Sequence, residues 1–343
     1  MIYSIFPKHT ATVYSRYPTM NTSKDEILEL NKTVSSSEVA GIFNTKILLD
    51  FDLAEHSASN SASGITPAKY DLTLYTANVN TPIDSFTYQI SDVSHPWGTG
   101  LGRSTHNPKT TEGVSWAHPS SSISAWPEPA YPDTANDSNN ISGTYKTDLT
   151  ADVTTLIKLV EVNSTSDNGI MLSRTDTEEL DGNKYGYVNF YSTETSTVYK
   201  PRLGIYYDDD TFSTGSLTAL DLTKEHYIYQ ATNLGTYKIN STPKFRFIGR
   251  EKYPTATYTA STAALVEYLP TSSYYSLVDV RTGETVVPFD TTYTKISCDA
   301  NGNFANLKLS GIYPDRLYQF HIRVDHNGTS GYHILDDMFR VYE

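Results

Sequence analysis

Apolar and polar residues alternate with a period of two along many short stretches of the chain, which is the pattern of half-buried β-strands. In the first half this holds at Asp25–Leu30 and Tyr70–Thr76, while Lys46–Leu53 begins as a continuous apolar run and then alternates. Residues 153–160 instead place apolar side chains at i, i+3, i+4 and i+7, which predicts one short amphipathic helix. The pattern predicts an all-β protein with a single helix.

The C-terminal part has no helical spacing and reads as short strands separated by turn signals such as Asn301-Gly302-Asn303. The strand candidates there are Lys244–Gly249, Ala264–Leu269, Tyr274–Val280, Thr285–Pro288, Lys295–Cys298, Phe304–Leu309, Leu317–Val324 and Met338–Tyr342. Strands at this spacing predict a β-sandwich of about seven strands. A polar connector follows Asp208–Asp210, so we expect two tandem β-sandwich domains, residues 1–211 and 212–343.

Between residues 91 and 143 the alternation disappears, and this stretch holds all three tryptophans, Trp97, Trp116 and Trp126, together with Tyr131. A loop of this length in a compact domain is usually functional or packed against the domain. Three interpretations stay open: the aromatic residues anchor the loop on the sandwich, form contacts with another protein, or stack on a glycan.

The composition excludes several classes of protein. The 343 residues include 26 basic and 39 acidic side chains, a net charge of −13 without a basic stripe, so we expect no nucleic-acid binding. No apolar run approaches the length of about 18 residues that a membrane helix needs, and no Sec-type signal peptide is visible. The single cysteine, Cys298, excludes an internal disulfide and a cysteine-based metal cluster.

Sequence motifs for catalysis or cofactor binding are missing, since G-x-S-x-G, H-E-x-x-H, Walker A and G-x-G-x-x-G do not occur. The best nominees for a glycosidase pair are Glu128 and Asp133, but sequence does not show their separation. Residues 299–303 resemble a fragment of a calcium loop, and a turn between two strands explains them better. The histidines are scattered and expected at the surface, so we predict no metal and no cofactor.

The first domain carries, in order, the segments KILLDFDL, YDLTLYT, the tryptophan-bearing loop, DVTTLIKLV, NGIMLS and KPRLGIYYDD. This order resembles the DNRLRE-type domain of secreted bacterial adhesive proteins and of virion proteins of tailed phages. The helix of that family usually carries a tryptophan near its end, where this chain has Val160 or a neighbour. The resemblance implies a jelly-roll-like β-sandwich with one covering helix.

In the second domain, residues 309–318 (LSGIYPDRLY) are similar to the approach to a late strand in fibronectin type III and Ig-like modules. Tyr318 occupies the place of the tyrosine corner, whose hydroxyl bonds back to the loop backbone. The two modules in tandem look like structural proteins of large tailed phages.

The resemblance implies a non-enzymatic virion component that contacts other virion proteins and forms a homo-oligomer in the particle. It is expected to bind neither a membrane nor nucleic acid. The neck, collar or tail is favoured, and capsid decoration is compatible. The alternative is a carbohydrate-binding adhesin or receptor-binding module that contacts a surface glycan through Trp97, Trp116, Trp126 and Tyr131.

Overall fold

A computed structural model describes residues 1–35, 41–53, 56–57, 66–79, 86–120, 124–127, 131–133, 140–145, 147–162, 168–254 and 267–343. The fold class is all-β, as predicted: strands dominate, and the helices α2 (Thr154–Val162) and α3 (Asp176–Leu180) are short. No helix in these ranges is long and apolar enough to cross a membrane.

The chain divides into two compact units. Ile5–Gly204 forms one, here called the N-terminal unit, and Met1–Ser4 with Ile205–Glu343 forms the other, the C-terminal unit. The division passes through β1 (Ile2–Ile5) and β12 (Arg202–Tyr206), so it falls seven residues before the boundary expected at residue 211. The first four residues join the C-terminal unit through long-range contacts, which no local sequence pattern encodes.

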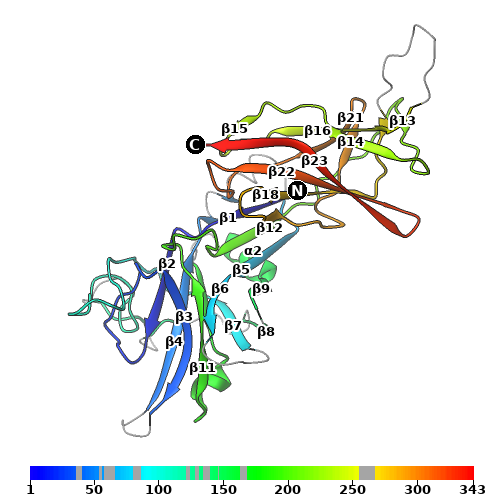
Figure 1. Ribbon diagram of the computed structural model, residues 1–343. Coiled ribbons are helices and arrows are strands. Elements are labelled where there is room, and N and C mark those ends of the chain that lie inside the picture. The colour runs from blue at the N-terminus through cyan, green and yellow to red at the C-terminus, as the bar shows by residue number, and fades with distance from the viewer. Residues whose placement is uncertain are drawn as a thin grey trace. The chain divides into compact units, whose positions relative to one another are not determined.

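The N-terminal unit contains a twisted sheet in the order β6-β11-β3-β4-β10-β7-β8, with β2 paired to β4 off this path (Figure 1). Its strands are β2 (His9–Tyr14), β3 (Ile27–Val34), β4 (Ile42–Asp50), β6 (Thr76–Val79), β7 (Phe86–Asp92), β8 (Ile141–Tyr145), β10 (Ile170–Ser173) and β11 (Tyr185–Tyr191). Residues 47–49 of β4 are fully buried on both faces, which explains the continuous apolar run in this strand.

The predicted helix packs on this unit as α2. Val153, Leu156 and Ile157 are buried, and the Asp152 carboxylate accepts a hydrogen bond from the Thr154 amide at 2.9 Å, which caps the first turn. The side chain of Val160 lies outside the described residues. The residues just before the helix form a strand, β9 (Leu149–Asp152), which pairs with β5 (Lys69–Leu74).

The C-terminal unit is built from two sheets, in the orders β13-β17-β16-β21-β20, with β14 beside β16, and β15-β23-β22-β18-β19. Their strands are β13 (Thr218–Ala219), β14 (His226–Gln230), β15 (Thr236–Lys238), β16 (Lys244–Glu251), β17 (Glu267–Tyr268), β18 (Ser273–Asp279), β19 (Thr285–Val287), β20 (Ser297–Asp299), β21 (Gly302–Asn306), β22 (Leu317–His326) and β23 (Thr329–Tyr342). β23 begins nine residues earlier than predicted, because its first half is largely exposed and lacks the apolar alternation of a buried strand.

Phenylalanine rings from both sheets form the centre of this sandwich. Phe320 of β22 lies 4.8 Å from Phe245 and 5.2 Å from Phe247 of β16, between ring centroids, and Phe339 of β23 lies 4.9 Å from Phe245. All four side chains are fully buried. The alternation read from the sequence therefore places the inward residues of β16 and β22 correctly.

Candidate functional site

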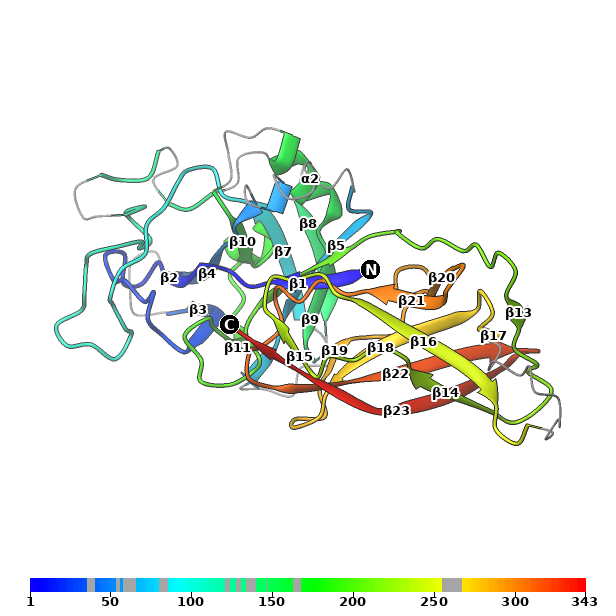
Figure 2. The ribbon, with the colours of Figure 1, turned by 90° about the horizontal axis from the view of Figure 1, so that it is seen from above.

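The tryptophan loop connects β7 to β8, and its described residues 93–120, 124–127 and 131–133 lie beside β2 and β4 of the N-terminal unit (Figure 1, Figure 2). Asn21, itself fully buried, holds it there: its amide nitrogen donates to the Val114 carbonyl at 2.7 Å, and its amide oxygen accepts from the Gly102 amide at 2.9 Å. Gly100 and Gly102 allow this approach, since a Cβ on either would meet Asn21 within 3 Å. The loop is thus packed on the sheet through specific contacts.

A small apolar cluster forms between the loop and the sheet. Its buried members are Ala11, Val13, Leu48, Val93, Val114, Trp126 and Met171, and Trp97 and Trp116 pack against it. Trp126 is 3% exposed and donates from Nε1 to the Ser115 carbonyl at 3.0 Å, and Trp97 donates to the Asn168 carbonyl at 2.9 Å. Of the three interpretations, this burial favours the loop anchor for Trp126, because a buried indole offers little surface to a partner. It anchors the loop.

The other two predicted residues come together at the edge of this cluster. The rings of Trp116 and Tyr131 stack with centroids 5.7 Å apart, and Tyr131 is 36% exposed. The Lys46 ammonium lies 5.8 Å from the centre of the Trp116 ring and 5.1 Å from that of Tyr131, and it donates to the Pro132 carbonyl at 3.1 Å. Lys46 itself is buried, so the two rings cover a cation on the sheet.

Acidic side chains from α3 complete this site. Oε2 of Glu179 lies 3.6 Å from Nζ of Lys46. Burial raises the pKa of Glu179, the attraction of Lys46 opposes that rise, and the charges of Asp176 and Asp133 add to it. Burial, followed by the charges of Asp133, Glu179 and Asp176, also raises the pKa of Tyr131.

A second buried lysine holds the end of α3. Lys32 of β3 donates to the backbone carbonyls of Glu178 and Asp181, the latter at 2.6 Å, and forms an ion pair with the Asp181 carboxylate at 2.5 Å. The Lys32 hydrogen bond, joined by one from Tyr185, holds the pKa of Asp181 well below its ordinary value. A cation at this position satisfies carbonyls that a helix leaves unpaired at its C-terminal end.

The candidate site is therefore an aromatic platform, the half-buried Trp116 and the exposed Tyr131, above the buried Lys46–Glu179 ion pair. An aromatic face next to carboxylates and carbonyls is suited to a polar partner with apolar patches, such as a protein loop or a sugar ring.

Of the two glycosidase nominees, Asp133 lies near Glu179 and Tyr131, and Glu128 lies outside the described residues. Lys46 and Glu179 were not predicted as site residues, because neither belongs to a sequence motif.

Other predicted residues have structural roles. Tyr318 donates from its hydroxyl to the Tyr313 carbonyl at 2.7 Å, which confirms the tyrosine corner. The carboxylate of Asp299, at the start of the calcium-like segment, bonds to both terminal nitrogens of Arg246 at 2.8 Å, and the segment turns from β20 into β21. Within the described ranges, no three or more His, Cys, Asp or Glu side chains gather as a metal-binding group.

No protein-family model matches this chain, and no curated protein matches it. Among solved structures, a crystal structure of a DUF4785 family protein from Legionella pneumophila subsp. pneumophila str. Philadelphia 1 is similar at 7% identity and a TM-score of 0.19. The alignment covers 100% of this chain and 64% of the length of that protein. At this TM-score the likeness carries no argument about function.

Proposed function

We propose that this protein is a non-enzymatic structural component of a tailed-phage virion, most readily of the neck, collar or tail, that acts through contacts with neighbouring subunits. Three features support the proposal. The order of segments in the first 210 residues resembles a domain type known from virion proteins, the fold consists of two β-rich units, and the net charge of −13 suits the outer face of a particle.

The observation that carries the proposal is the outer face of β22 and β23. Arg323 is opposite Tyr332, His321 opposite Ile334, and Leu317 opposite Arg340 in the antiparallel register, so these side chains share the face turned away from the core. Tyr332 and Ile334 are 65% and 64% exposed, and Leu317 and Met338 are also exposed. Adjacent exposed apolar side chains on a sheet face are typical of a protein–protein contact.

Antibody labelling of intact particles in the electron microscope tests the location. We expect label at the neck or tail, and particles without label would contradict a virion role.

A matched pair of variants tests the surface. Ile334→Asp is expected to reduce incorporation into particles, because a carboxylate would be desolvated in the contact. Leu234→Asp, at an exposed leucine of the same unit, is expected to leave incorporation unchanged. Equal incorporation of both variants would exclude this face as the contact.

A second function, glycan binding, is favoured by one observation, the exposed Tyr131 ring stacked on Trp116. Sugar rings stack on such platforms through their C–H faces. Tyr131→Ala would then abolish binding to a glycan array while Tyr17→Ala, at an exposed tyrosine elsewhere in the same unit, would not. A wild-type protein that binds no glycan on the array excludes this function.

A further inference from the structure

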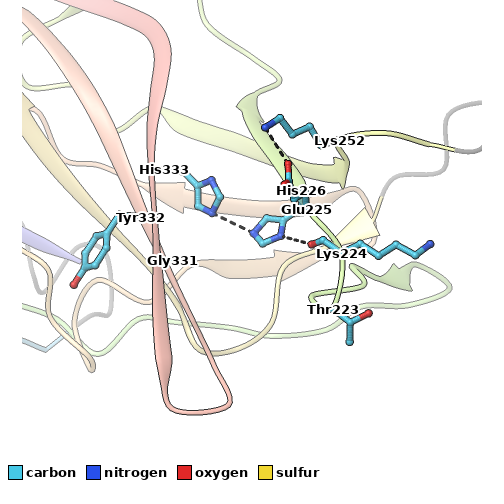
Figure 3. Close-up of a pocket in the computed structure, with 8 residues that line it drawn as sticks. All are labelled: Thr223, Lys224, Glu225, His226, Lys252, Gly331, Tyr332 and His333. Atoms are coloured by element: carbon cyan, nitrogen blue, oxygen red, sulfur yellow. Dashed lines mark hydrogen bonds and ion pairs between the residues drawn. The ribbon is translucent and has the colours of Figure 1, made fainter.

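Two histidines that are 107 residues apart in the chain meet in the C-terminal unit. His226 begins β14, which pairs with β16, and His333 belongs to β23, so each comes from a different sheet of the sandwich. Their Nε2 atoms lie 3.1 Å apart, and Figure 3 shows the two rings turned toward each other. From the sequence, both are expected to be scattered surface residues.

The spacing of the two rings matches that of two imidazole ligands of one metal ion. Their centroids are 4.8 Å apart and their planes are inclined by 43°. A metal ion about 2.05 Å from each Nε2 would lie roughly 3.2 Å from each centroid and subtend an N–metal–N angle of roughly 100°. If the two nitrogens are 3.1 Å apart, such an ion places the two ring centroids roughly 4.8 Å apart. The observed distance between the centroids is 4.8 Å. The hydrogen-bonded pair of rings therefore has the nitrogen and centroid separations that one shared ion requires.

The backbone orients His226 for this role. Its Nδ1 lies 3.3 Å from the Lys224 carbonyl, which has no proton to give, so Nδ1–H is the donor and the lone pair of the neutral ring is on Nε2. Metal-binding histidines commonly have this second hydrogen bond to a carbonyl.

The two histidines border an open cavity of about 430 Å³, which has room for water around an ion. Its lining residues are Thr223, Lys224, Glu225, His226, Lys252, Gly331, Tyr332 and His333. The two lysines there are paired with acids: Lys252 lies 3.1 Å from Glu225, and Lys224 lies 3.2 Å from Glu251. Their charges are thereby partly compensated near the histidines.

We propose that His226 and His333 form a site for a late first-row divalent transition metal, with Zn²⁺, Ni²⁺ or Cu²⁺ bound by the two Nε2 atoms and by water. Imidazole nitrogens prefer these ions over Mg²⁺ and Ca²⁺, which select oxygen ligands. With two protein ligands the site exchanges its metal, unlike a closed structural zinc site. The ion would join the two sheets at β14 and β23.

Isothermal titration of the full chain with ZnCl₂, repeated with NiCl₂ and MgCl₂, tests the proposal. We expect one Zn²⁺ or Ni²⁺ per chain, no Mg²⁺, and a higher unfolding temperature of the C-terminal unit with metal. His226→Gln and His333→Gln should each abolish both effects, while His321→Gln, in the same unit, should keep them. Near-UV circular dichroism of the metal-free variants checks that they are folded.

Absence of Zn²⁺ and Ni²⁺ binding by the wild-type protein would overturn the proposal. So would binding that persists in either His226→Gln or His333→Gln, because the ion would then use other ligands.

Discussion

The Lys46 ammonium group lies 3.6 Å from the Glu179 carboxylate, and the stacked rings of Trp116 and Tyr131 cover it. One partner comes from a central strand and the other from a helix 133 positions later in the chain. Because both side chains are largely removed from water, this pair couples the tryptophan loop, the sheet and α3 through one interaction.

Removing the cation alone should destabilise the N-terminal unit. Lys46→Met is expected to cost about 3 kcal/mol of unfolding free energy, because it leaves the Glu179 carboxylate without its partner. The double variant Lys46→Met/Glu179→Gln is expected to recover most of that loss, since neither member of the pair then carries a charge. Urea unfolding of the full chain measures both, and a double variant no more stable than Lys46→Met would contradict the expected coupling.

The pH dependence of stability should report Glu179. Burial raises its pKa in the folded protein above the ordinary value of 4.5, so folding favours the protonated form. The wild-type protein is therefore expected to lose stability relative to Glu179→Gln as the pH rises from 4.5 through the raised pKa. Urea midpoints over a pH series measure the difference, with Glu112→Gln at an exposed site as control. Parallel profiles of wild type and Glu179→Gln would contradict the prediction.

Trp126 should control the order of the tryptophan loop. Trp126→Ala is expected to cost about 3–5 kcal/mol, since it empties the centre of the small cluster and leaves the Ser115 carbonyl unpaired. Leu101→Ala, at an exposed leucine of the same loop, should change stability by less than about 0.5 kcal/mol. Calorimetry and limited proteolysis of the loop measure the two variants, and equal protection of the loop in both would refute the anchoring role.

The hydroxyl of Tyr318 should contribute to the stability of the C-terminal unit. Tyr318→Phe keeps the buried ring but removes the donor to the Tyr313 carbonyl, and we expect a loss of about 1–3 kcal/mol. Tyr332→Phe, at an exposed tyrosine of the same unit, serves as the control and should be nearly neutral. The midpoint of chemical unfolding measures the effect, and an unchanged midpoint for Tyr318→Phe would show that water replaces the bond.

Alanine substitutions at two glycines distinguish the cost of steric crowding from the cost of backbone strain. Gly311 and Gly283 both have positive φ angles, 82° and 71°. A Cβ at Gly311 would lie 1.4 Å from the Ser4 carbonyl oxygen, whereas nothing lies within 4 Å of a Cβ at Gly283. Gly283→Ala should cost about 1 kcal/mol from the left-handed backbone alone, and Gly311→Ala clearly more. Thermal unfolding compares them, and equal losses would mean that the first four residues shift without cost.

Much of the fold could be predicted because strand alternation is local. The helix at residues 153–160, the strands with buried alternation such as β16 and β22, and the tyrosine corner each follow from residues close together in the chain. The first half of β23 escaped prediction because its side chains are mostly exposed. β9 was not predicted, because four residues are too few to define a period.

The candidate site was predicted only in part. Trp116 and Tyr131 were singled out by residue type, and the structure brings them together, but Trp126 of the same loop is an anchor. Lys46 and Glu179 carry no sequence signal, since a lysine at the start of an apolar strand and an acidic turn are each ordinary surface features.

The all-β class, the short helix and the loop that interrupts the strands follow from the amino-acid sequence alone, since these depend on the period of side chains along the backbone. Three features appear only in the folded chain: the burial of Trp126, the place of Met1–Ser4 in the C-terminal unit, and the contact of His226 with His333. The physical reason is that burial, charge pairing and ligand geometry arise between residues far apart in the chain, where the pairing of strands sets the distances.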